Sequence, residues 1–318
     1  PQAPSLYDPL VNLATAQERQ ATVLALMVRQ GYLSEAQAAL ARQEQLRFAA
    51  VPFPIQAPHF VMYVRAWLES QFGAEAIYRD GLVVTTTLDL DWQNTAQAIA
   101  RRHLADLSQA QDGKPERNVN NAALVALDPH TGQILAMLGS PDYFDAKISG
   151  AVNAALALRQ PGSSIKPVTY AAAFDPRAPE PYTPATLVLD VRTSFLTKEG
   201  EPYVPRNYDL RYHGPVLLRQ ALASSYNLPA VKVLDHVGLE NMIALARRMG
   251  IRTFSDSERY GLALTLGGGE VRLLDLTAAY AVFANGGYRV EPVAVLEVRD
   301  ARGRVRYRWR AAPPERVL

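Results

Sequence analysis

The chain of 318 residues opens with apolar positions at helical spacing. These positions run from Val23 to Val28, Gly31 provides a C-terminal stop, and Ser34 with Gln37 forms a capping box for a second helix. The pattern predicts a helical hairpin over residues 15 to 47. We expect this hairpin to be an appendage with a structural role.

Prolines and a polar run divide the next part of the chain. Pro52, Pro54 and Pro58 predict a linker, and the polar run from Gln109 to Asn118 predicts a second boundary. Between these boundaries the pattern predicts a helix, a strand and an amphipathic helix, over His59 to Phe72, Leu82 to Thr87, and about Asp91 to Leu107.

Beyond the second boundary, two hairpins enclose a mixture of helices. Each hairpin is predicted from two apolar runs around a turn: Ala122 to Leu127 with Gln133 to Leu138, and Val293 to Val298 with Val305 to Trp309. Helices mixed with such hairpins are typical of an α+β domain.

The segment from Arg159 to Pro167 places a serine and a lysine three residues apart, directly after a Pro-Gly turn. A helix that begins here puts Ser163 and Lys166 on one face, as a nucleophile and its base require. The base is needed because a neutral hydroxyl is a poor nucleophile. Backbone N–H groups at the helix start can stabilise a developing oxyanion. The alternative is a serine N-cap followed by a solvated lysine.

The choice of lysine at position 166 indicates a role in proton transfer. The chain has only five lysines, and Lys166 alone follows a serine by three residues. An exposed lysine has a pKa of about 10.4, so the site must remove it from water or share its proton. Arginine, which is far more abundant in this chain, does not give up its proton in proteins.

A second candidate element, Ser225 with Asn227, lies between two apolar helical stretches. Ser225 can relay a proton between Lys166 and a leaving amine, and Asn227 can hold the amide backbone of a substrate. The alternative is a helix break at Asn-Leu-Pro with capping serines. The order of the two motifs, about sixty residues apart, favours catalysis.

The two motifs resemble the signature of penicillin-binding proteins and serine β-lactamases. The chain resembles a class A penicillin-binding protein, the bifunctional peptidoglycan synthase, over nearly its whole length. Further similar segments are Gly81 to Asp89, Asn207 to Asp209, His213 to Val216, Thr265 to Val271 and Tyr280 to Gly287.

The resemblance implies a penicillin-binding protein transpeptidase/serine β-lactamase-like α+β domain. In that domain, Ser163 would be acylated by D-alanyl-D-alanine stem peptides, with Lys166 as base, Ser225 as relay and Asn227 as substrate clamp. It also implies that the enzyme cross-links glycan strands, is trapped covalently by β-lactams, and works at the extracytoplasmic face of the bacterial cytoplasmic membrane. Its membrane anchor would lie outside this chain.

Two motifs of the family are absent from the sequence. The nearest string to Lys-Thr-Gly, Lys198-Glu199-Gly200, lies before Ser225 instead of after it, and no Glu-Asp-x-x-Phe motif of a glycosyltransferase site occurs. We therefore expect three segments: the tail of a glycosyltransferase domain over 1–50, a linker region over 51–118, and a transpeptidase domain over 119–318 that stops before its third motif. We expect this fragment alone to be inactive.

Composition narrows the remaining possibilities. A net charge of +2 gives no reason to expect nucleic acid, and the absence of cysteine excludes disulfides and thiolate metal sites. The five histidines have no metal-ligand spacing, so we expect no cofactor. No apolar run approaches the eighteen or so residues of a transmembrane helix.

Two other patterns indicate structure instead of chemistry. The glycines at 267 to 269 lack the Lys-Ser/Thr of a P-loop and the spacing of a dinucleotide site, so they predict tight packing. Asp89 and Asp91 predict a helix start and not an acid/base pair.

Two alternative functions stay open. A carboxypeptidase or β-lactamase uses the same first motifs but lets water resolve the acyl-enzyme, although the long N-terminal appendage argues against a free-standing β-lactamase. A non-catalytic scaffold that binds peptidoglycan or partner synthases gains support from the absent third motif.

Overall fold

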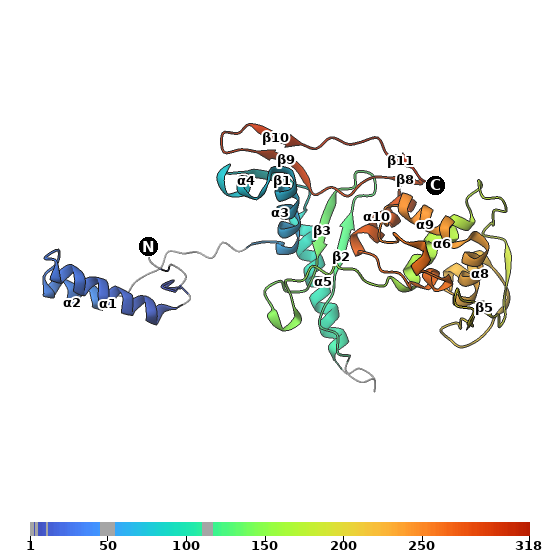
Figure 1. Cartoon of the computed structure of the whole chain (residues 1–318), viewed down its shortest axis with the longest axis horizontal. Helices are drawn as coiled ribbons and strands as arrows, with labels where there is room; N and C mark the ends of the chain where they lie inside the picture. Colours follow the sequence, from blue (N-terminus) through green and yellow to red (C-terminus); the bar gives the residue numbers. More distant parts are fainter. Residues whose placement is uncertain (1–2, 4–5, 11, 45–54, 110–116) are drawn as a thin grey trace. The chain divides into compact units, whose positions relative to one another are not determined.

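The computed structural model describes residues 3, 6–10, 12–44, 55–109 and 117–318. The chain divides into two compact units, Pro1–Pro54 and Ile55–Leu318 (Figure 1). The predicted linker prolines Pro52 and Pro54, and positions 110–116 of the predicted polar boundary, lie outside the described residues.

The first unit contains the predicted helical hairpin. Its helices are α1 (Leu13–Arg29) and α2 (Glu35–Gln43). The capping box is confirmed: the Ser34 hydroxyl accepts from the Gln37 N–H at 3.2 Å, and Gln37 Oε1 accepts from the Ser34 N–H at 2.9 Å. Gly31 has φ +76°, the left-handed conformation that ends many helices. Positions 45–47 of the prediction lie outside the described residues.

One part of the second unit is built around antiparallel strands. The strands β1 (Val83–Thr86), β9 (Val295–Arg299) and β10 (Val305–Arg308) form one sheet in the order β1-β9-β10, and β2 (Leu124–Leu127) pairs with β3 (Ile134–Leu138). Both predicted hairpins are therefore confirmed. Each strand lies within its predicted run, except that β9 extends one residue further, to Arg299.

Three helices complete this part: α3 (Pro58–Phe72), α4 (Ala74–Arg79) and α5 (Leu90–Ser108). Asp89 is the N-cap of α5 and accepts from the N–H groups of Asp91 and Trp92, which confirms the predicted helix start. Residues of α3, β3 and β9 share one buried apolar cluster. The described part of the predicted linker region thus belongs to the same compact unit as the hairpins.

The other part of the second unit is mainly helical. Its helices are α6 (Lys166–Ala173), α7 (Leu218–Ala223), α8 (Asn227–Val237), α9 (Leu239–Arg248) and α10 (Leu273–Ala284). Three short strand pairs accompany them: β4 (Leu187–Asp190) pairs with β7 (Gly214–Leu217), β5 (Phe195–Leu196) with β6 (Pro202–Tyr203), and β8 (Tyr288–Arg289) with β11 (Glu315–Arg316). Short 3₁₀ turns cover Ala146–Ile148 (η1), Gly162–Ile165 (η2), Ser257–Arg259 (η3) and Leu262–Leu266 (η4).

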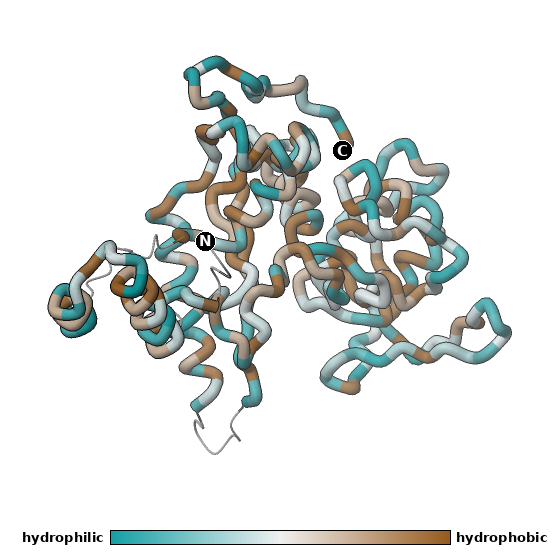
Figure 2. Tube along the Cα trace, turned by 60° about the vertical axis from the view of Figure 1, so that its left-hand side comes forward, coloured by the Kyte–Doolittle hydropathy of each residue, from teal (hydrophilic) through white to brown (hydrophobic). Residues whose placement is uncertain are grey.

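The helix α8 lies at the centre of this helical part. It contacts α6, α7, α9, η4 and β4, and Leu228, Val231 and Leu234 on it are fully buried. Burying each such side chain contributes about 1.5–3 kcal/mol. In Figure 2 much of the brown, hydrophobic trace belongs to the inner turns of the packed segments, whereas the outer loops are largely teal and white. The first residue of α8 is Asn227, so this packing fixes where one predicted site residue lies.

Candidate active site

Of the four predicted site residues, Lys166 makes the most hydrogen bonds to the others. It is the first residue of α6 and is 1% exposed. Its Nζ donates to the Ser225 carbonyl at 2.6 Å, to Asn227 Oδ1 at 2.8 Å and to Ser225 Oγ at 3.2 Å. An ammonium group has three donors, so these contacts satisfy it completely. The structure therefore brings together three of the four residues that the sequence singled out.

Burial changes the acidity of this lysine. Removal from water lowers the pKa of Lys166 from 10.5 to about 8, since desolvation disfavours the charged form. At pH 7 about a tenth of the molecules then carry a neutral Nζ, against fewer than about one in a thousand for an exposed lysine. A lysine in this state can accept a proton close to neutral pH.

Ser225 lies in a turn that ends α7. The Tyr226 N–H donates to the Ala221 carbonyl at 2.9 Å and the Ser225 N–H to the Leu222 carbonyl at 3.0 Å, the pattern of a Schellman motif. The left-handed residue of this motif is usually glycine, but here it is Ser225 with φ +54°. A side chain in that conformation costs about 1–2 kcal/mol. The strained turn directs both the carbonyl and the hydroxyl of Ser225 at Lys166.

Asn227 holds Lys166 from the first turn of α8. Its Oδ1 accepts from Lys166, and its Nδ2 donates to the Arg206 carbonyl at 2.9 Å. An amide nitrogen has two N–H groups, so one of them has no partner among the described residues. That N–H leaves Asn227 able to donate one further hydrogen bond.

Ser163 lies in η2, directly before α6, and is exposed. The sequence predicted a helix start here, and the structure places one, but its first turn is a 3₁₀ turn. The physical reason is Pro167, which has no N–H to donate to the Ser163 carbonyl; the Lys166 N–H donates to it instead. Positions three apart are eclipsed in a 3₁₀ turn, so Ser163 and Lys166 share one side. Among the described residues, no hydrogen bond joins Ser163 Oγ to Lys166.

Close backbone packing fixes the turn that carries Ser163. A Cβ atom on Gly267 would lie 2.3 Å from the Gly162 nitrogen, and Gly267 has φ +92°. Only glycine fits such a position without displacing the neighbouring backbone. The Tyr280 hydroxyl also donates to the Ser164 carbonyl at 2.7 Å. The prediction that the triple glycine serves tight packing is confirmed.

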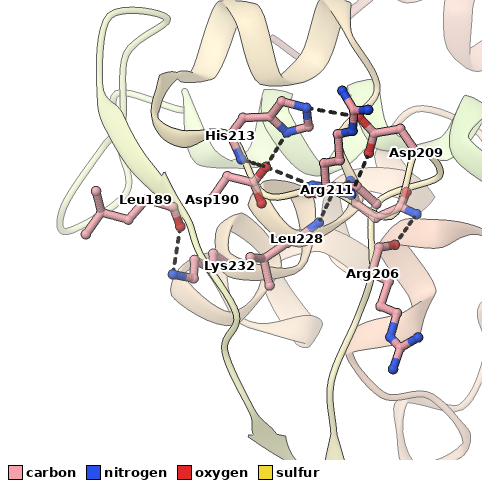
Figure 3. Close-up of polar contacts among 10 residues, drawn as sticks. Leu189, Asp190, Arg206, Asp209, Arg211, His213, Leu228 and Lys232 are labelled. Carbon is pink, nitrogen blue, oxygen red and sulfur yellow. Dashed lines mark hydrogen bonds and ion pairs between the residues drawn. The ribbon is translucent and has the colours of Figure 1, made fainter.

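Three buried or half-buried polar residues linked to Asn227 were not predicted: Asp190, Asn207 and His213. Asp190 and His213 are drawn in Figure 3. Asn207 donates to Asp190 and accepts from the backbone of Asn227, and His213 contacts Asp190. They are too far apart in sequence to form a local motif. The one available signal was that Asn207 and His213 fall in segments that resemble the family framework.

Known proteins match this chain in sequence and in structure. Residues 122–317 match the family described as "Penicillin binding protein transpeptidase domain". The chain is 33% identical over 314 residues to penicillin-binding protein 2D of Bacillus subtilis strain 168, and 27% identical over 379 residues to penicillin-binding protein 1A of Aquifex aeolicus strain VF5. Each alignment covers 96% of this chain, but 42% and 51% of the two relatives.

The crystal structure of penicillin-binding protein 1A from Haemophilus influenzae gives a TM-score of 0.77 at 24% identity, and the match covers 99% of this chain and 58% of that one. At this identity the likeness shows the fold alone.

The chain belongs to the penicillin-binding protein transpeptidase family, and the predicted α+β fold of that family is confirmed. It spans about half the length of the curated relatives it matches. The family match begins at residue 122, close to the predicted domain start at 119, but the three segment boundaries stay a prediction. None of the described helices combines the length and the hydropathy of a membrane span.

Proposed function

We propose that this chain contributes a serine DD-transpeptidase site to a peptidoglycan synthase. Ser163 is the acyl acceptor, Lys166 the base, Ser225 the proton relay and Asn227 the substrate clamp. The substrates are D-alanyl-D-alanine stem peptides on glycan strands, and β-lactams are covalent inhibitors. The whole protein works at the extracytoplasmic face of the bacterial membrane and also polymerises glycan strands.

In the first half-reaction, Ser163 Oγ attacks the carbonyl between the two D-alanines. A neutral Lys166 takes the hydroxyl proton as the new C–O bond forms. The C–N bond then breaks, and Ser225 Oγ relays the proton from Lys166 to the leaving nitrogen, so that D-alanine departs as a neutral amine. A backbone N–H at the start of η2 can stabilise the oxyanion that develops on the carbonyl.

In the second half-reaction, the amine of another stem peptide attacks the acyl-enzyme. The proton moves in the opposite direction, from the amine through Ser225 and Lys166 to Ser163, and a peptide cross-link replaces the ester. A β-lactam stops at the ester because its leaving nitrogen stays attached to the acyl group and blocks the incoming amine.

One observation carries the proposal. The buried Lys166 gives all three of its hydrogen bonds to Ser225 and Asn227, and it lies one turn after an exposed serine. A lysine that served only to stabilise the fold would gain by pairing with a carboxylate, since a buried charge without one is costly. No carboxylate contacts Lys166 among the described residues. This arrangement suits a group that must lose and regain its proton.

The test is covalent labelling of the full-length protein by fluorescent penicillin, followed by mass spectrometry of the labelled peptide. We expect the adduct on Ser163. Ser163→Ala should abolish labelling, since loss of a nucleophile that acts as a unit with its base costs on the order of a millionfold in rate.

Ser164→Ala is the matched control, because Ser164 is also exposed and its hydroxyl donates only to the Pro161 carbonyl. This variant should keep most of the labelling. Labelling that persists in Ser163→Ala would contradict the assignment. A wild-type protein that binds peptidoglycan but is not labelled would favour a non-catalytic scaffold.

A further inference from the structure

We infer that Asp190, Asn207 and His213 form a positioning unit that holds Asn227, and through it Lys166, in the geometry needed for proton transfer. The inference rests on the proposed function. Among the described residues, no hydrogen bond joins any of the three to Ser163 or Lys166, so each acts through its neighbours.

Asn207 holds the start of α8. Its Oδ1 accepts from the N–H of Asn227 at 2.8 Å and from the N–H of Leu228 at 3.3 Å. These N–H groups lack intrahelical partners because they begin the helix. A residue at the N-cap usually accepts from them, but Tyr226 at that position makes no such bond. The cap of α8 is thus supplied by a loop twenty residues earlier in the chain.

The amide of Asn207 has a single possible orientation. Its Nδ2 donates to Asp190 Oδ2 and to the Arg211 carbonyl, both at 2.8 Å. Both partners are acceptors only, so the nitrogen must face them and the oxygen must face α8. Both N–H groups of Asn207 and both acceptor positions of its oxygen are used, and the residue is only 3% exposed. The position of Asp190 therefore fixes the position of Asn227 through Asn207.

Asp190 is the anchor of the unit. It is the last residue of β4, is fully buried, and pairs in register with Gly214 of β7. Its Oδ2 accepts from Asn207 Nδ2, from the His213 N–H at 3.0 Å and from His213 Nδ1 at 2.6 Å. A buried carboxylate needs such partners, so Asp190 ties the loop that carries Asn207 and His213 to the strand pair.

His213 completes the unit on the outer side (Figure 3). Its Nε2 lies 3.1 Å from Asp209 Oδ2, so both ring nitrogens face carboxylate oxygens, an arrangement that favours the protonated ring. The hydrogen bond to Asp190 and the charge of Asp209 raise the pKa of His213 above its usual value. The ring also stacks on Tyr226, with 3.9 Å between ring centroids. Tyr226 lies between Ser225 and Asn227 in the sequence. The unit therefore holds this turn twice, at the backbone N–H of Asn227 and at the ring of Tyr226.

A second contact fastens α8 to the same strand. Lys232 Nζ donates to the Leu189 carbonyl at 2.8 Å, one residue before Asp190. The helix is therefore held to β4 near its middle even when its first turn is released. We expect a change at Asn207 to move the first turn of α8 without unfolding the helix.

The first test compares Asn207→Ala with Asn241→Ala in the full-length protein. Asn241 is an exposed asparagine whose Nδ2 donates to a helix-end carbonyl, so its loss is a matched control. We expect Asn207→Ala to lower the rate constant of penicillin acylation by about 10- to 100-fold, since misplacement by about 1 Å can cost about 100-fold. An acylation rate equal to that of Asn241→Ala would overturn the inference.

The second test separates positioning from general stability. His213→Ala removes the donor to Asp190, whereas His213→Asn keeps an N–H near the place of Nδ1. We expect His213→Ala to lose about tenfold in acylation rate and His213→Asn to recover most of it. His236→Ala is the control, because His236 also stacks on a tyrosine at 3.9 Å but lies outside the unit. Equal losses in both His213 variants would overturn the inference, and these milder changes decide the question if Asn207→Ala fails to fold.

A third measurement does not depend on penicillin. In the full-length protein, the Nζ resonance of Lys166 can be assigned by NMR as the signal that Lys166→Arg removes. We expect Asn207→Ala to lower the titration midpoint of Lys166, because a weakened bond to Asn227 stabilises the ammonium less. If the wild-type protein is not acylated, the proposed function fails; an unchanged Lys166 midpoint in Asn207→Ala contradicts the positioning unit instead.

Discussion

Ser163 and Lys166 are three residues apart, yet the structure holds them by different means. Ser163 is exposed, makes no side-chain hydrogen bond among the described residues, and is fixed by its backbone, where Gly267 approaches Gly162. Lys166 is buried, and its side chain is held by three hydrogen bonds to Ser225 and Asn227.

The difference matches the two chemical roles. A nucleophile must meet a substrate that arrives from solvent, so a hydroxyl on a rigid backbone turn leaves its oxygen accessible. A base must have a shifted pKa, which requires burial, and burial in turn requires partners for the charged form. Backbone packing therefore positions Ser163, whereas side-chain hydrogen bonds position Lys166. Variants that remove hydrogen bonds and variants that change shape should act on different halves of the site.

The largest effect is expected at the base itself. Lys166→Arg should be nearly as damaging as Lys166→Ala, on the order of a millionfold in acylation rate, because arginine keeps the charge but cannot accept a proton. Acylation rates of the two variants, measured side by side with fluorescent penicillin, decide the point. Substantial rescue by arginine would show that Lys166 acts as a cation only.

Two variants of Ser225 separate the effect of its hydroxyl from the effect of its backbone conformation. Ser225→Ala and Ser225→Gly both remove the relay, so both should lose about 100- to 10,000-fold in acylation rate. Glycine has no Cβ to strain at φ +54°, so Ser225→Gly should be more stable than Ser225→Ala by about 1 kcal/mol. Chemical denaturation measures this difference. Equal stability of the two variants would count against the strained turn.

Of the three comparisons at Lys166, Ser225 and Gly267, the smallest loss of rate is expected from a change of shape next to the nucleophile. Gly267→Ala places a Cβ against the Gly162 backbone and should lower acylation by about 100-fold through displacement of Ser163. Gly200→Ala is the matched control, since Gly200 has φ +83° but nothing within 4 Å of the added Cβ. Both variants bear the same backbone strain, so only displacement of Ser163 distinguishes them. Equal acylation by the two would contradict the role of this packing.

Features with local signals were predicted from the sequence. The capping box of α2, the start of α5 at Asp89, the two hairpins and the turn between α7 and α8 each depend on a few neighbouring residues. The cluster of Lys166, Ser225 and Asn227 followed from two short motifs whose order matches a known signature.

Features that depend on tertiary contacts were not predicted. The pairing of β1 with β9 joins Val83 to Arg299, and neither run identifies its partner. Asn207 caps a helix that begins twenty residues later, and Asp190 reaches His213 across a strand pair. Asparagine, aspartate and histidine at such separations match no local pattern, so only the folded chain reveals their connection.

The pH dependence of penicillin acylation reports whether a buried lysine with a pKa of about 8 must be neutral for Ser163 to react. Since burial lowers this pKa and the base works without its proton, the acylation rate constant should rise about tenfold per pH unit below pH 8 and level off above it. The measurement uses the full-length protein between pH 6 and 10, with the intact fold checked at each pH. A rate that is independent of pH over this range, or that falls as the pH rises through 8, would contradict Lys166 as the base.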